Sequence, residues 1–116
     1  MYIYDRAHQL AADIKQSEEF KTYKALKYEL YAEETTKSLL KQYKQAQFEA
    51  QAMVMSGQQP SEELMDKLKK VGEVLAFNPK VTEFFAAEYK FNTIVSDIYK
   101  IIGDACELDT GLFEQE

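Results

Sequence analysis

The sequence predicts an all-α fold, an elongated antiparallel bundle of about five helices. Apolar residues recur at spacings of three and four along several segments, as on one face of a helix. Only four Gly and two Pro interrupt 116 residues, whereas strand-rich folds need many turns. With 46% hydrophobic residues, the chain can form one small core. We therefore predict a single helical domain over 1–106 and an acidic, flexible C-terminal tail over 107–116.

Two helices are predicted in the first third of the chain. The first covers about 3–16, with Ile3, Ala7, Leu10 and Ile14 on one face. Ser17 has the chemistry of an N-cap for the second, and the two glutamates that follow it suit the positive end of a helix. The second helix runs to about residue 32. Its buried stripe comprises Phe20, Tyr23, Leu26 or Lys27, and Leu30.

A long third helix is predicted near 35–56, after a short turn where the phase of the apolar pattern resets. Its stripe comprises Thr36, Leu39, Tyr43, Ala46, Ala50 and Met53, with Leu40 and Val54 beside it. The small side chains of Ala46 and Ala50 would let another helix approach closely.

A loop and a shorter fourth helix come next. Gly57 can adopt the left-handed C-cap conformation, and Pro60 cannot continue a helix. Ser61 is the predicted N-cap of the fourth helix. Its stripe comprises Leu64, Leu68, Val71 and Leu75. Gly72 lies inside this helix at a cost of ~1 kcal/mol relative to Ala, which favours a close contact with another helix there.

The last helix, predicted near 79–105, has the longest apolar stripe. Asn78 would cap it and Pro79 suits its first position. The stripe comprises Phe84, Ala87, Phe91, Ile94, Ile98, Ile101 and Ala105. Such a face must be buried against other helices, within one chain or between two. Because long helices in a small chain leave apolar surface uncovered, we expect a homodimer. The two long stripes are the candidate core or interface seams.

The distribution of charge argues against two classes of partner. The net charge is −6, and its acidic excess lies entirely in residues 59–116. General nucleic-acid binding and anionic membrane surfaces both need clustered basic residues. The one segment that mixes lysines with aromatic residues is 21–31, so the alternative reading is an RNA-associated accessory factor that uses the Lys21–Lys27 face. A solvated helix face with lysine stems packed along it is the simpler interpretation.

The expected localisation and the expected lack of catalysis both follow mainly from features that the sequence does not contain. It has no run of ~18 apolar residues and no signal-peptide pattern at the N-terminus, and its single Cys106 fits a reducing compartment. We therefore expect a cytoplasmic protein. His8 and Cys106 lie at opposite ends of the chain, and no paired carboxylate site is evident. We expect no catalytic residues, no cofactor, no metal site and no enzyme activity.

Several of these features together resemble the YlbF/YmcA family of small helical bacterial proteins, nearest its YheA-like branch. They are Ser17-Glu18-Glu19-Phe20, Glu33-Glu34 before Lys37, Tyr43 with Gln47 and Gln51, the Gly57 loop and Asn78-Pro79-Lys80-Val81. The resemblance implies an all-helical, often dimeric fold without enzyme activity. Better-studied members are regulatory subunits of a complex that promotes competence, sporulation and biofilm development and influences RNA processing through a ribonuclease. Some members bind an iron–sulfur cluster, but a cluster takes about four thiolates, and Cys106 stands alone.

The function expected from the sequence is therefore a non-catalytic protein–protein interaction or regulatory role. The protein would act as a helical homodimer, or as a subunit of a ribonuclease-linked regulatory complex. An enzyme that uses carboxylates alone is the third hypothesis, and the sequence offers no site for it.

Overall fold

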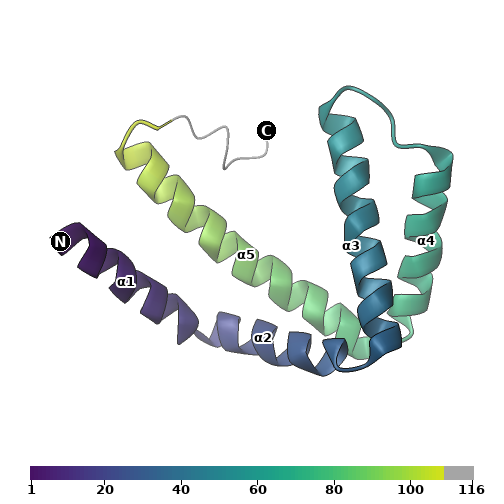
Figure 1. Cartoon of the computed structure of the whole chain (residues 1–116), viewed down its shortest axis with the longest axis horizontal. Helices are drawn as coiled ribbons and strands as arrows, with labels where there is room; N and C mark the ends of the chain where they lie inside the picture. The colour runs from purple at the N-terminus through teal and green to yellow at the C-terminus, as the bar shows by residue number, and fades with distance from the viewer. Residues whose placement is uncertain (109–116) are drawn as a thin grey trace. The chain divides into compact units, whose positions relative to one another are not determined.

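The structure is a computed structural model that describes residues 1–108, and it confirms the all-α prediction. Five α-helices and no strand occur in this part of the chain. They are α1 (Tyr2–Lys15), α2 (Glu18–Tyr31), α3 (Glu34–Met55), α4 (Glu62–Ala76) and α5 (Pro79–Ala105), drawn in Figure 1. The predicted tail falls mostly on residues 109–116, which lie outside the described residues.

The predicted signals at the helix ends are confirmed by their hydrogen bonds. The Phe20 amide donates to the Ser17 hydroxyl at 3.2 Å, and the Leu64 amide donates to the Ser61 hydroxyl at 3.1 Å. Each bond satisfies an amide that the first turn of a helix leaves unpaired. Gly57 has a φ of +85°, the left-handed conformation that glycine adopts without strain after a helix.

The chain forms two compact units. Unit 1 is residues 1–25 together with 84–108 of the described chain, and unit 2 is residues 26–83. The helices α2 and α5 contribute residues to both units. The sequence prediction of one domain over 1–106 stays a prediction.

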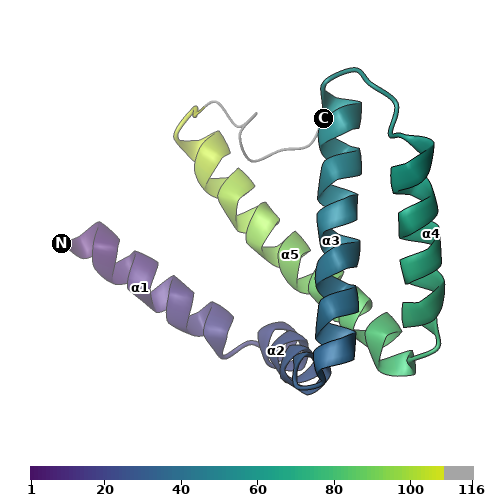
Figure 2. The same cartoon turned by 45° about the vertical axis from the view of Figure 1, so that its right-hand side comes forward.

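Unit 2 is built on a hairpin of two antiparallel helices. In this unit α3 and α4 lie side by side, as Figures 1 and 2 show from two directions. The buried apolar residues of the unit are Leu30, Leu40, Ala46, Leu64, Leu75 and Val81. Leu40 has no exposed surface, although the sequence placed it beside the stripe of α3. The buried face of α3 is therefore wider than the 3-4 pattern and extends to Leu40.

Gly72 of α4 marks a close contact inside the hairpin, as the sequence predicted. A Cβ atom added at Gly72 would lie 3.2 Å from Cε1 of Tyr43 on α3. The missing side chain thus lets the aromatic ring pack directly against the backbone of α4. This contact fixes one point where the two helices of the hairpin meet.

Unit 1 is held together by an aromatic cluster between α2 and α5. The ring centroids of Phe20 and Phe91 are 5.2 Å apart, and Tyr23 lies 5.8 Å from Phe84 and 5.4 Å from Phe91. The Tyr23 ring stacks on both phenylalanines, with interplanar angles of 16°. Phe84 is fully buried. Tilted and stacked aromatic pairs add stability beyond the area they bury.

Candidate interaction surfaces

The predicted apolar seam of α5 becomes more exposed from the start of the helix to its end. Phe84 has no exposed surface, whereas Ile101 is 67% exposed. The members between them, Ala87, Phe91, Ile94 and Ile98, are half-buried, and Ala105 is exposed. The aromatic cluster covers the start of the seam. The last two turns of α5 present isoleucines to the surface.

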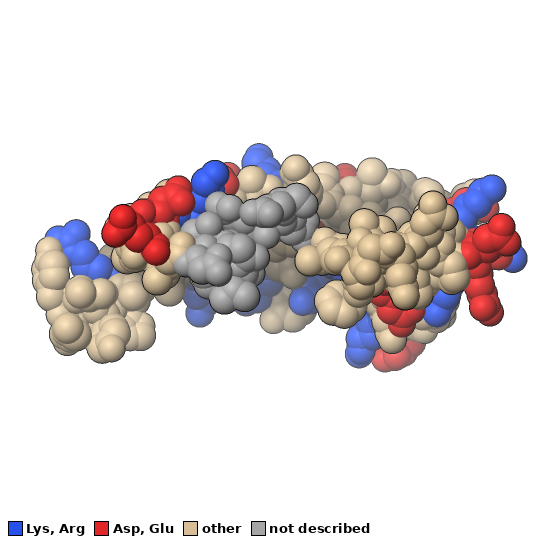
Figure 3. Space-filling view, turned by 90° about the horizontal axis from the view of Figure 1, so that it is seen from above, with Lys and Arg blue, Asp and Glu red and all other residues tan. Residues whose placement is uncertain are grey.

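The helix α1 has no buried residue at all. Of its predicted stripe, Ile3 is 66% exposed, Leu10 is exposed, and Ile14 near the start of α2 is half-buried. Tyr2 and Tyr4 are also exposed. The free end of α1, at the left of Figure 3, shows mainly uncharged surface. Apart from the partly covered Ile14, the predicted apolar face of this amphipathic helix is exposed in the described chain.

The predicted seam of α3 is buried or half-buried along its whole length. Ala46 is buried, and Thr36, Leu39, Tyr43, Ala50 and Met53 are half-buried. Residues 54 and 55, at the end of α3, are exposed. No member of the α3 seam is fully exposed, whereas the α5 seam ends in exposed residues.

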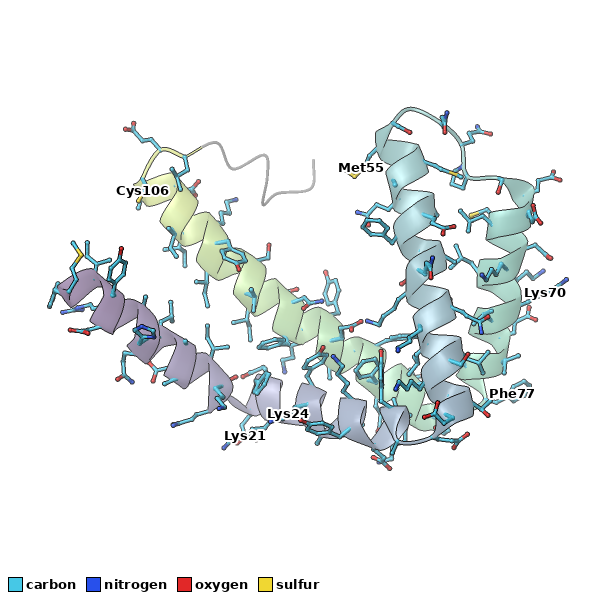
Figure 4. The ribbon with its side chains drawn as sticks, in the orientation of Figure 1. Lys21, Lys24, Met55, Lys70, Phe77 and Cys106 are labelled. Atoms are coloured by element: carbon cyan, nitrogen blue, oxygen red, sulfur yellow. The ribbon has the colours of Figure 1, made fainter. Side chains whose placement is uncertain are left out.

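A hollow lies near the tip of the hairpin, between α3 and α4. Its volume is about 560 Å³, and it is lined by Gln47, Ala50, Gln51, Val54, Pro60, Met65 and Leu68. Met55 stands at the same tip in Figure 4 and is 77% exposed. The sequence analysis missed this hollow because it requires the two helices to be set side by side. The only sequence signal is the presence of apolar residues on both sides of the predicted loop.

The lysines of α2 lie against rings on their own helix. The ammonium of Lys24 is 5.9 Å from the centroid of the Phe20 ring, and that of Lys27 is 5.6 Å from the Tyr31 ring. Lys21 and Lys24 are labelled on α2 in Figure 4. Such cation–π contacts hold the charges near the helix surface. They give the 21–31 segment an explanation that needs no bound RNA.

The residues able to support chemistry are dispersed. Within residues 1–108, no group of three or more His, Cys, Asp or Glu side chains could hold a metal ion. His8 lies on α1, and Cys106, just after α5, is an exposed free thiol. On α4 the Lys70 ammonium lies 2.9 Å from the Asp66 carboxylate. The hydrogen bond to Asp66, and then its charge, raise the pKa of Lys70. This is an ordinary pair on a helix surface.

Sequence comparison decides the family. Residues 3–107 match the family described as "Control of competence regulator ComK, YlbF/YmcA". The chain belongs to this family. A UPF0342 protein of Halothermothrix orenii is 35% identical over 116 residues, which span 100% of this chain and 97% of that protein. A UPF0342 protein of Clostridium novyi is 34% identical over 109 residues, covering 94% and 96% of the two chains.

Solved structures share the fold of this YlbF/YmcA protein. A protein of unknown function (DUF964) from Bacillus stearothermophilus superposes with a TM-score of 0.70 at 19% identity, covering 92% of this chain and 94% of that one. A chain in the crystal structure of Bacillus subtilis RicA in complex with RicF gives a TM-score of 0.58 at 23% identity, covering 91% of this chain and 94% of that one. No helix within residues 1–108 is both long and apolar enough to span a membrane.

Proposed function

We propose that this YlbF/YmcA protein is a non-catalytic interaction or regulatory protein that works as a homodimer in the cytoplasm. The observation that carries the proposal is the uncovered apolar face of unit 1. It is formed by α1, which buries nothing, and by the last turns of α5. Monomeric soluble proteins rarely expose contiguous apolar surface on this scale unless it binds something.

The energetics of α1 support a partner. A helix of 14 residues is marginal in water by itself, because helices in proteins are stabilised mainly by packing of their apolar face. The exposed apolar residues on or beside these two faces are Ile3, Tyr4, Leu10, Ile101 and Ile102. Ile3, Tyr4 and Ile101 are each about two thirds exposed, so their apolar surface is open to a partner.

The relatives favour a role in a protein assembly. The family is described by its control of a competence regulator, and the related RicA forms a complex with RicF. Neither description names a reaction. We therefore place this chain among regulatory subunits that act by binding, with its own second copy as the first partner.

An RNA-associated role receives less support. The lysines of α2 already lie over aromatic rings, and the net charge of −6 opposes phosphate binding. Phosphate contacts must weaken steeply with added salt. RNA binding at low salt that falls in this way would restore the RNA hypothesis.

Analytical ultracentrifugation over a range of concentrations tests the homodimer. We expect a dimer at micromolar concentration, and a monomer there would overturn the proposal. Ile98→Asp should abolish assembly or folding, because a charge on the seam would be buried without a partner. Ser96→Asp, at an exposed position on the same helix, is the matched control and should leave the dimer intact.

A screen of generic hydrolase substrates tests the non-catalytic part of the proposal. We expect no turnover above buffer. Turnover that a single Asp or Glu substitution abolishes would show an enzyme instead. A pull-down of the native protein from its own cells would then identify the partners of the assembly.

A further inference from the structure

The apolar face of α1 has the spacing of a coiled-coil seam. Ile3, Ala7, Leu10 and Ile14 follow one another at intervals of four, three and four. In heptad terms, Ile3 and Leu10 take the d positions, and Ala7 and Ile14 take the a positions. None of these side chains is fully buried within the described chain. The seam is therefore available to another helix.

Two opposite charges lie along one edge of this seam. Arg6 and Asp13 are seven residues apart, so both take the g position of the heptad. The surface along this edge is hollowed, with a volume of about 500 Å³, and Arg6, Leu10 and Asp13 are among the residues that line it. The hollow gives a second helix room to lie beside both charges.

The contacts of these two side chains are made within α1. The Arg6 guanidinium donates a hydrogen bond to the Tyr2 hydroxyl and lies 4.6 Å from the centroid of its ring. The Asp13 carboxylate accepts a hydrogen bond from the Gln9 amide at 3.0 Å. All four side chains belong to α1, and neither charge forms an ion pair with another described residue. Both charges can therefore turn toward a partner helix.

We propose that α1 pairs antiparallel with α1 of a second copy. This inference rests on the proposed homodimer and names the contact that orients it. The heptad sets the register: Ile3 lies opposite Ile14 of the second copy, and Ala7 lies opposite Leu10. Each layer thus joins two branched side chains or one small and one large side chain, which keeps the spacing between the helices even.

The charges select the antiparallel orientation. A two-fold axis perpendicular to both helices reverses the chain direction and brings each edge of the seam opposite the same edge of the other copy. Arg6 then meets Asp13 of the second copy, and Asp13 meets Arg6, so the dimer gains two ion pairs. In a parallel pair the Arg6 edge would face Tyr4 and Ala11 instead, and no ion pair would form.

The opposite edge of the seam fits the same register. Tyr4 and Ala11 are also seven residues apart and both take the e position. In the antiparallel pair the large ring of Tyr4 lies over the small Ala11 of the second copy. The seam is only two heptads long, and short helices associate weakly alone. The α1 pair therefore orients a dimer to which the exposed end of α5 can contribute further area.

Charge reversal tests this pairing directly. Arg6→Glu sets two carboxylates against one another at both ion pairs of the dimer, and Asp13→Arg sets two guanidinium groups against one another there. Either variant alone should weaken the dimer on the order of tenfold. The double variant Arg6→Glu/Asp13→Arg should restore wild-type affinity, because both pairs are attractive again. An equimolar mixture of the two single variants should form the mixed dimer in preference to either homodimer.

The controls separate the pairing from folding and from the homodimer itself. All three variants should keep wild-type helicity by circular dichroism, since both positions are exposed. Lys15→Glu makes the same charge change as Arg6→Glu at an exposed b position of α1 that does not line this hollow, and it should leave the dimer unchanged. If the single variants weaken the dimer but neither the double variant nor the mixture restores it, α1 contacts another element of the second copy and the antiparallel pairing is wrong. If none of the charge reversals changes the dissociation constant of the dimer, the α1 pairing is wrong but the homodimer stands. If the wild-type protein is a monomer, the homodimer is wrong as well.

Discussion

Unit 2 and unit 1 use similar apolar stripes in opposite ways. Of the seven buried apolar residues in the described chain, six lie within residues 26–83 and only Phe84 lies in unit 1. In unit 2, α3 and α4 cover one another along the hairpin. In unit 1, α1 buries nothing and the end of α5 carries Ile101 at 67% exposure. One unit completes its core within the chain, and the other leaves apolar surface for a partner.

This difference teaches how far an apolar stripe can be interpreted. A stripe establishes that one face of a helix needs an apolar neighbour. It carries no information on whether that neighbour belongs to the same chain. The same kind of substitution should therefore have different effects in the two units. Loss of an apolar side chain should cost folding stability in unit 2 and association in unit 1.

The largest effect is expected from Leu40→Ala in unit 2. Leu40 has no exposed surface, so its truncation leaves a cavity and should lower the free energy of unfolding by about 2–5 kcal/mol. Urea denaturation measures this loss. The neighbouring Lys41→Ala, on the exposed side of α3, should change stability by less than about 0.5 kcal/mol. A small effect at Leu40 would show that unit 2 is not the better-packed region.

Ile101→Asp should act on association instead of folding. Ile101 is 67% exposed in the single chain, so the chain should keep its helicity. In the proposed dimer the new charge would face an apolar partner surface, and we expect the dimer to weaken by at least about tenfold. Sedimentation gives the dissociation constant. If the Ile101→Asp variant dimerises with wild-type affinity, the end of α5 is not part of the interface.

Gly72→Leu should destabilise the hairpin through its tightest contact. The Tyr43 ring already lies 3.2 Å from the place of a Cβ atom, so a larger side chain must displace it, at about 1–3 kcal/mol. Gly72→Ala should stay within about 1 kcal/mol of wild type, because the better helix propensity of alanine offsets the shift of the ring. Thermal unfolding of wild type and both variants measures their order of stability. Equal stability of all three proteins would contradict the contact.

Substitution of the N-cap serines tests the stability of the two units at equivalent positions. Ser17 caps α2 and Ser61 caps α4, each through one hydrogen bond to an amide three residues later. Replacement of either by Ala should cost about 1 kcal/mol. If both losses appear in one cooperative transition, the units unfold together. A loss confined to a separate, less stable transition for Ser17→Ala would show that unit 1 unfolds independently.

The smallest effect is expected from Asp66→Asn. The Asp66–Lys70 pair is exposed on α4, where ion pairs contribute little. The raised pKa of Lys70 means that its small contribution is present at neutral pH and is lost as the pH rises above the ordinary lysine range. Because an exposed pair contributes so little, melting temperatures of wild type and Asp66→Asn should be nearly equal even at pH 7. A clear difference would indicate that this face of α4, labelled at Lys70 in Figure 4, contacts a partner.

Much of the fold follows from local signals. The five helices were predicted with ends within a few residues of those observed, because caps such as Ser17 and Ser61 and the breaks at Gly57 and Pro79 act on their immediate neighbours. The absence of strands from residues 1–108 followed from the spacing of apolar residues. The pairing of the two long helices with one another stays a prediction, as do the seam residues as an interface.

The sequence by itself determined the helices, their ends and their apolar faces, since each depends on residues close along the chain. The tertiary structure decided which faces find a neighbour. It joined Tyr23 to Phe84 and Phe91, set Gly72 against Tyr43, and left the face of α1 uncovered. Such contacts depend on where whole helices lie, and a stripe of apolar residues is compatible with many arrangements of equal burial.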